Sequence, residues 1–283
     1  MRIGINLWTL WGFEKPRLID ASVLKELHSF GADAIEWVLD EGHCNYAAFM
    51  AQKPRLQDAI ASIGMKATSV ASGLFWKYNL SSTREEVRRK GLEVVRAECE
   101  VASAFGAKVV LVIAGLPESG ATYREQMDAA IRTLSEAGRI AAEYGVIVGI
   151  ENVWSGFIAS PSEYATLLDR VDSPHVKAYL DIGNALAAGL PEQWLEAVQG
   201  RIALVHVKDF NLQDGSRRGW RICGRGNMAW TEILSALRKT GYDGYLIVET
   251  PPDFPIGEDI RIDHGLAAAR ESVGFLRRLL TAG

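Results

Sequence analysis

The chain alternates short apolar runs with longer amphipathic segments, and it does so eight times. Most of these runs are continuously apolar, which is typical of parallel strands that are buried on both faces. The alternation therefore predicts an α/β protein built from repeated strand-then-helix units. The predicted strands are Ile3–Leu7, Ala34–Val38, Lys66–Ala71, Val109–Ala114, Val146–Ile150, Ala178–Leu180, Ile202–Val207 and Tyr245–Val248.

The segments between the runs have the spacing of amphipathic helices. Glu85–Phe105 repeats apolar residues with charges between them, and Tyr123–Tyr144 and Thr231–Thr240 are similar. Several segments end in a glycine just before the next strand, for example Gly106 and Gly145. A glycine at that position is typical of a left-handed helix cap.

Two architectures contain such units, a closed (β/α)8 barrel and an open doubly wound sheet. Eight units in 283 residues average about 35 residues each, the size of a βαβ repeat. The first strand lacks the GxGxxG turn of the dinucleotide-binding open sheet. We therefore predict a single (β/α)8 TIM barrel domain over residues 1–283, which no linker-like stretch divides.

The net charge of the chain is −4, from 31 basic and 35 acidic residues. This balance gives no electrostatic footprint for nucleic acid or an anionic membrane. No apolar run approaches the roughly 18 residues of a membrane span, and the N-terminus lacks the pattern of a signal peptide. The three cysteines are widely spaced and form no CxxC motif, which favours reduced thiols and a cytoplasmic location.

Four consecutive predicted strands end in, or contain, a residue that can bind a metal: Glu151, Asp181, His206 and Glu249. They are separated by 30, 25 and 43 positions, so only closure of a barrel would bring them together. One acidic residue at a strand end usually caps a loop, but barrel enzymes place their catalytic groups at these ends. Three carboxylates and one imidazole suit Mn²⁺, Mg²⁺ or Co²⁺, so we predict one divalent ion per chain.

The segments IENVW, YLDIGN, HVKDF, GRGNMAW and YLIVET resemble those of the xylose isomerase-like superfamily of sugar and sugar-phosphate isomerases and epimerases. The resemblance covers nearly the whole chain and implies that the same four residues hold a metal, Mn²⁺ first among the candidates. In the ketose 3-epimerases of that family two glutamates are the acid/base pair, a role that falls here to Glu151 and Glu249. The resemblance further implies a small sugar or sugar phosphate as substrate, and a homodimer or homotetramer.

One position departs from the free-ketose 3-epimerases, which typically have a histidine three residues after the metal-binding aspartate. Asn184 stands there in this chain. Its DIGN and HVKD motifs resemble those of L-ribulose-5-phosphate 3-epimerases and hexulose-phosphate isomerase-like proteins more closely. We therefore include Asn184 among the substrate-binding candidates.

Other substrate contacts are predicted from position and chemistry. Glu36 lies inside an apolar strand, where an unpaired carboxylate is costly; it faces a substrate cavity or pairs with a structural arginine or lysine. Lys208 and Asp209 follow His206 directly, so one of them contacts substrate or orients a ligand, unless they pair at the surface. Trp76 and Trp154 follow strands and form an aromatic wall for a sugar, or simply pack between loops.

The segment 214–230 carries Arg225 and three other arginines among four glycines. Barrels frequently bind phosphate with the loops after strands seven and eight, through backbone N–H groups and basic side chains. Arg225 is therefore a candidate phosphate ligand. The alternatives are a solvated basic loop and a contact with a neighbouring subunit.

The leading hypothesis is a metal-dependent 3-epimerase of a ketose or ketose phosphate, because inversion needs two bases and two glutamates supply them. An aldose–ketose isomerase and a dehydratase acting on a keto-sugar or keto-inositol could use the same residues. An endonuclease IV-like repair enzyme shares the fold but needs more histidines than the five present. A sugar-binding barrel without catalysis is the remaining alternative, which the complete ligand set disfavours.

Overall fold

The computed structural model describes residues 1–12, 20–250 and 262–282. Eight parallel strands close into a barrel in the order β1-β10-β7-β6-β5-β4-β3-β2. Because β1 pairs with both β10 and β2, the sheet has no open edge, and the predicted barrel is confirmed over the open sheet. The strands are β1 (Arg2–Asn6), β2 (Ala34–Leu39), β3 (Lys66–Ser72), β4 (Val109–Ile113), β5 (Ile147–Glu151), β6 (Val176–Asp181), β7 (Ile202–Val207) and β10 (Tyr245–Val248).

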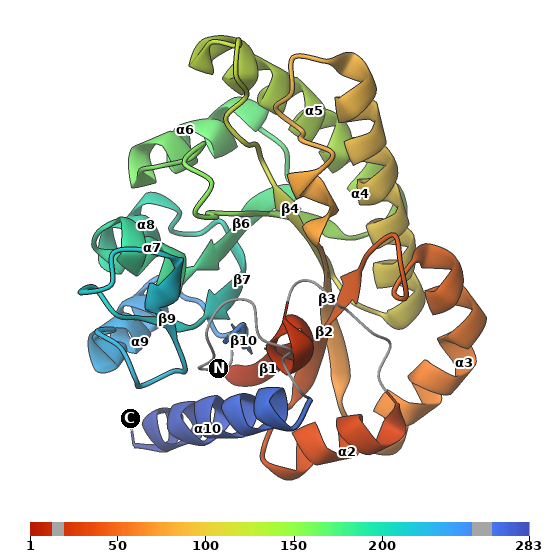
Figure 1. Cartoon of the computed structure of the whole chain (residues 1–283), viewed down its shortest axis with the longest axis vertical. Helices are drawn as coiled ribbons and strands as arrows, with labels where there is room; N and C mark the ends of the chain where they lie inside the picture. The colour runs from red at the N-terminus through yellow and green to blue at the C-terminus, as the bar shows by residue number, and fades with distance from the viewer. Residues whose placement is uncertain (13–19, 251–261, 283) are drawn as a thin grey trace.

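The helices surround the barrel as an outer ring, and the last of them, α10, packs against α1 and α2 (Figure 1). They are α1 (Trp8–Trp11), α2 (Ala21–Ser29), α3 (Tyr46–Ser62), α4 (Glu85–Phe105), α5 (Tyr123–Tyr144), α6 (Pro161–Val171), α7 (Ile182–Ala188), α8 (Pro191–Ala197), α9 (Trp230–Lys239) and α10 (Ile262–Thr281), with short 3-10 turns η1 (Gly73–Trp76) and η2 (Arg217–Gly219). Among the described residues, no helix combines the length and apolar composition needed to cross a membrane.

The two longest predicted helices, α4 and α5, have the predicted bounds. Gly106 and Gly145 end them in the left-handed conformation, with φ of 74° and 64°. A residue with a Cβ is strained at such angles, so glycine permits the sharp return into β4 and β5. These short returns fix where each strand begins, and therefore which residues reach its C-terminal end.

Side chains alternate along each strand, so every second residue points into the barrel. On β6, Tyr179 and Asp181 share the inward face. Gly149 on β5 leaves the space that the tyrosine occupies, because a Cβ there would lie 2.9 Å from the Cβ of Tyr179. On this strand a tyrosine and an aspartate thus occupy the barrel interior, which barrels usually fill with apolar side chains.

The structure contains a small second sheet that the sequence did not predict. The segment after β7 contains a two-stranded antiparallel ribbon of β8 (Asp209–Phe210) and β9 (Trp220–Arg221). The ribbon holds the first part of the arginine-rich segment at the C-terminal mouth of the barrel. The predicted loop is therefore partly ordered by strand pairing.

Candidate metal centre and active site

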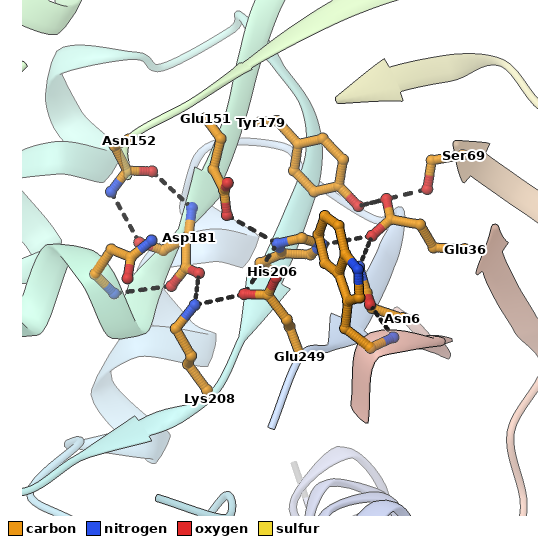
Figure 2. Close-up of polar contacts among 12 residues, drawn as sticks. Asn6, Glu36, Ser69, Glu151, Asn152, Tyr179, Asp181, His206, Lys208 and Glu249 are labelled. Carbon is orange, nitrogen blue, oxygen red and sulfur yellow. Dashed lines mark hydrogen bonds and ion pairs between the residues drawn. The ribbon is translucent and has the colours of Figure 1, made fainter. Parts of the chain in front are cut away.

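The four predicted metal ligands lie together at the C-terminal mouth of the barrel (Figure 2). They lie at the C-terminal ends of four neighbouring strands: Glu151 and Asp181 are the last residues of β5 and β6, His206 is the last but one of β7, and Glu249 follows β10. One potential ligand atom from each lies within 4.8 Å of the others, and all four side chains are buried. The structure thus brings together Glu151, Asp181, His206 and Glu249, as predicted from their positions at strand ends.

His206 lies between two carboxylates. Its Nδ1 is 2.9 Å from Oε1 of Glu151, and its Nε2 is 2.7 Å from Oε1 of Glu36. Burial alone would lower the pKa of His206, but the charges of Glu36 and Glu249 outweigh it and raise the pKa well above the ordinary value. Burial and the nearby Glu249 carboxylate also raise the pKa of Glu151 to about 7. The site therefore holds protons that a bound cation would displace.

Lys208 is the second buried cation of the site. Its Nζ forms ion pairs with Asp181 and with Glu249, the latter at 2.5 Å, and lies 5.1 Å from the ring centre of Trp220. Gly183 makes room for it, since a Cβ at that position would lie 2.5 Å from Cγ of Lys208. Pairing of Lys208 at the surface, one of our alternatives, is wrong; its ammonium contacts two ligand carboxylates.

Asp181 is held from two sides by neighbouring polar groups. Its backbone exchanges hydrogen bonds with the Asn152 side chain at 2.9 and 2.7 Å, and its Oδ1 accepts the backbone N–H of Asn184 at 2.8 Å. The side-chain Oδ1 of Asn184 is buried without a hydrogen-bond partner among the described residues. Asn152 was not among the predicted site residues, although its place directly after Glu151 could have suggested it.

Glu36 is fully buried in the barrel interior, and both of its oxygens accept hydrogen bonds from protein groups. Its partners are His206, Asn6 and Tyr179 (Figure 2), rather than the arginine or lysine that we considered. Burial raises the pKa of Glu36, but the charge and hydrogen bond of His206 and the hydroxyls of Ser69 and Tyr179 outweigh it and lower the pKa. The carboxylate thus contacts a predicted ligand rather than an open cavity.

Asp209 is fully buried as well, but its hydrogen-bond partners belong to the loop rather than to the metal cluster. Its carboxylate accepts the backbone N–H groups of Phe210, Gly224 and Met228 and the indole N–H of Trp230, at 2.9 to 3.0 Å. These four bonds use both oxygens and fold the segment after β9 back onto β8. Surface pairing of Asp209 is therefore wrong, and its carboxylate positions the loop.

The remaining predicted contacts lie at the rim. Trp76 and Trp154 stack with ring centres 4.5 Å apart and an angle of 25°, and each is about two-fifths exposed (40% and 41%). Their stacking brings the segments after β3 and β5 into contact.

Arg225 makes a two-pronged ion pair with Glu271 of α10, with both contacts at 2.6 Å. Its guanidinium is thus engaged by a carboxylate in this structure.

A divalent cation fits the donor set of the site. Four carboxylates, those of the cluster and Glu36, face at most two protein cations, His206 and Lys208. Buried charges are stable only when they are paired, so the site takes up protons, as the raised pKa of Glu151 shows, and a bound divalent ion would balance the charge in their place. Oxygen ligands with one imidazole suit Mn²⁺, Mg²⁺ or Co²⁺. The unsatisfied Oδ1 of Asn184 beside the cluster offers a further polar contact for whatever binds there.

Comparisons with known proteins identify the family and the fold. Residues 24–279 match the family described as xylose isomerase-like TIM barrel. The uncharacterised protein MJ1311 of Methanocaldococcus jannaschii is 32% identical over 181 residues, which span 62% of this chain and 61% of that protein, less than two thirds of its length. The L-ribulose-5-phosphate 3-epimerase UlaE of Salmonella paratyphi A is 26% identical over 235 residues, 80% of each chain. The crystal structure of a D-tagatose 3-epimerase-like protein superposes with a TM-score of 0.78 and 25% identity, covering 100% of this chain and 98% of that one.

Proposed function

The chain belongs to the xylose isomerase-like TIM barrel family, and on that premise we propose that it is a divalent-metal-dependent 3-epimerase of a ketose or ketose phosphate. We assign it to the isomerase class of enzymes, because its relative UlaE, which matches 80% of this chain, is an L-ribulose-5-phosphate 3-epimerase. The observation that carries the proposal is the buried cluster of two glutamates, an aspartate and a histidine at the barrel mouth.

The metal ligands in this proposal are Glu151, Asp181, His206 and Glu249, with Mn²⁺ as the first candidate and Mg²⁺ or Co²⁺ as alternatives. When bound, the ion would act as a Lewis acid that polarises the substrate carbonyl and offsets charge developing on its oxygens. Lys208 contributes a fixed positive charge beside Asp181 and Glu249. Its aliphatic stem passes Gly183, which holds the ammonium toward the cluster.

Two carboxylates carry the proton transfers. Glu151 and Glu249 are the outer members of the four neighbouring strand ends, so they flank the place where a substrate would lie. One glutamate takes the proton from C3, the C3–H electron pair forms the C2=C3 double bond, and the π pair of the C2=O bond moves onto the C2 oxygen, which gives an enediolate. The other glutamate then gives a proton to the opposite face of C3: the C2 oxygen re-forms the C2=O bond, and the C2=C3 π pair forms the new C3–H bond. Two facing bases permit inversion, which a single base does not.

The other predicted contacts are assigned by position. The side-chain oxygen of Asn184 lies beside the cluster without a partner among the described residues, so it suits a substrate hydroxyl. Trp76 and Trp154 form a stacked, half-exposed wall on which a sugar could pack. A phosphate on the substrate would have to draw Arg225 from Glu271. Arg225→Ala tests this: a higher KM for the ketose phosphate but not the free ketose would support the phosphate contact.

The test of the reaction is a panel of ketoses and ketose phosphates incubated with enzyme and Mn²⁺ in D₂O and followed by NMR. The proposal predicts inversion at C3 with deuterium entering there. Deuterium at C1 or C2 alone would instead support an aldose–ketose isomerase, and loss of water would support a dehydratase. The same panel after chelation of the metal should show no turnover.

A further inference from the structure

The barrel interior contains an ordered chain of hydrogen bonds that leads from the backbone of α1 to the predicted ligand His206. We infer that Glu36, held in place by Asn6, is a positioning residue that keeps the His206 proton on Nε2 and presents Nδ1 to the metal. The inference rests on the proposed metal site and names how one of its ligands is oriented.

The chain of hydrogen bonds begins at a backbone N–H group, which can only donate. The backbone N–H of Trp8 lies 2.6 Å from Oδ1 of Asn6, so that atom of the amide must be the oxygen. The amide nitrogen, Nδ2, then faces Oε1 of Glu36 at 2.5 Å. Since an amide NH₂ group only donates, Glu36 is the acceptor in this contact.

The same carboxylate oxygen meets the histidine. Oε1 of Glu36 is 2.7 Å from Nε2 of His206, and its other oxygen accepts the Tyr179 hydroxyl at 2.5 Å. A carboxylate that already accepts from Asn6 and Tyr179 can only accept from the ring as well. The ring must therefore carry a hydrogen on Nε2, because a lone pair there would face the carboxylate without a hydrogen bond.

The opposite ring nitrogen points into the metal cluster. Nδ1 lies 2.9 Å from Oε1 of Glu151 and 3.6 Å from Oε2 of Glu249. In a neutral ring with its hydrogen on Nε2, Nδ1 has the lone pair that a metal needs. The Tyr179 ring centre lies 4.5 Å from the His206 ring and packs against it, which limits rotation into other orientations. Figure 2 shows this arrangement, with Glu36 and the hydroxyl of Tyr179 on the side of the ring away from Glu151.

This assignment explains why the barrel has a charged group in its interior. An interior carboxylate is costly to bury, and barrels usually fill this space with apolar side chains. A carboxylate bound to the distal nitrogen of a metal-ligating histidine fixes the tautomer and the ring orientation, and its loss typically weakens metal binding 10- to 100-fold. Glu36 occupies that position relative to His206.

The test compares Mn²⁺ affinity, followed by EPR, in three variants of the full chain. Glu36→Met removes the acceptor and should weaken Mn²⁺ binding about 10- to 100-fold. Glu36→Gln keeps an oxygen for Asn6 and His206, while its NH₂ group can donate to the Tyr179 oxygen, so it should retain most of the affinity. Glu98→Met is the matched control: it also removes a fully buried carboxyl, but Glu98 contacts none of the ligands through a hydrogen bond. The control should leave the Kd unchanged.

A spectroscopic measurement tests the tautomer directly. In wild-type protein loaded with Mg²⁺, the ¹⁵N signals of the His206 ring should show a protonated Nε2 and an unprotonated Nδ1. The opposite assignment would overturn the inference even if Glu36→Met did not fold. Equal Mn²⁺ affinity in Glu36→Met and wild type would overturn the inference alone, whereas a wild type that binds no Mn²⁺ would overturn the proposed function with it.

Discussion

Among the described residues, two glutamates, Glu36 and Glu98, have no exposed surface at all, and their surroundings are opposite. Glu36 lies in the barrel interior and accepts hydrogen bonds from an amide, a phenol and an imidazole. Glu98 lies on α4, and neither of its oxygens has a hydrogen-bond partner among the described residues. The partners lower the pKa of Glu36 despite its burial, whereas burial and the charge of Glu36 raise the pKa of Glu98 well above the ordinary value.

The difference shows that burial alone does not decide the state of a carboxyl group. An ionised carboxylate is stable in the interior where donors and cations surround it, as they surround Glu36. Around Glu98 on α4 no such partners are present among the described residues, and the neutral acid is the favoured form. Partnered carboxylates should therefore carry function or order a loop, while an unpartnered one only costs stability.

The largest expected effect tests the functional side of this comparison. Glu249→Gln removes a proposed base and ligand, so kcat/KM for the ketose substrate should fall about 100- to 10,000-fold or more. Glu98→Gln makes the same change at the unpartnered glutamate of α4 and should leave kcat/KM close to wild type. Steady-state kinetics of both variants with saturating Mn²⁺ provides the measurement. Full turnover in Glu249→Gln would remove this residue from the acid/base pair.

The second prediction turns partnered carboxylates into unpartnered ones. Lys208→Met leaves Asp181 and Glu249 without their ammonium. Removing one member of a buried ion pair typically costs about 3–5 kcal/mol, so metal-free protein should unfold at a clearly lower urea concentration. Because a divalent ion can replace the missing charge, Mn²⁺ should recover more stability in this variant than in wild type. A stability loss that Mn²⁺ does not reduce would contradict the charge argument.

The sequence predicted the fold because its signal is local and repeated. Apolar runs such as Ile202–Val207 have the bounds of the observed strand, and the four metal-capable residues at strand ends lie together. The partner of Glu36 was not predicted, since His206 lies 170 positions away and meets it only across the closed barrel. The β8–β9 ribbon was missed because its two-residue strands are too short to produce an apolar pattern.

The different roles of the neighbouring residues Lys208 and Asp209 were also difficult to predict from the sequence. Lys208 points into the cluster and Asp209 into the loop, an alternation that the strand period predicts once the barrel interior is known. The comparisons with relatives support the class of reaction but not the metal, so the preference for Mn²⁺ stays a prediction. The cytoplasmic location and the homo-oligomeric state also stay predictions.

The third prediction concerns Asp209, whose carboxylate accepts hydrogen bonds but does not belong to the metal cluster. Asp209→Asn keeps the shape of the side chain but replaces one acceptor oxygen by an NH₂ group, which would face donors such as the indole of Trp230 or the backbone N–H of Met228. The expected loss in the free energy of unfolding is about 1.5–3 kcal/mol, the range for hydrogen bonds to a charged group. Thermal or urea unfolding measures it, with exposed Asp214→Asn in the same segment as the control. A change no larger than the control's would mean that these bonds contribute little.

The smallest expected effect is a gain in stability rather than a loss, and it concerns Glu98. A raised pKa means that the native protein keeps a proton on Glu98 that the unfolded chain loses above its ordinary pKa of 4.5. The contribution of Glu98 to stability is therefore fully present below pH 4.5 and is lost as the pH rises toward the native pKa, by up to about 1.4 kcal/mol per pH unit. Glu98→Met removes both this dependence and two unsatisfied oxygens, so it should stabilise the protein at pH 7 by about 1–3 kcal/mol. Urea unfolding from pH 4 to 8 should show the advantage of the variant growing with pH, while Glu93→Met, at an exposed position of the same helix, should show no such growth. An advantage that is constant over this range would mean that the native state does not keep the Glu98 proton, and the contrast with Glu36 would then rest on hydrogen bonding alone.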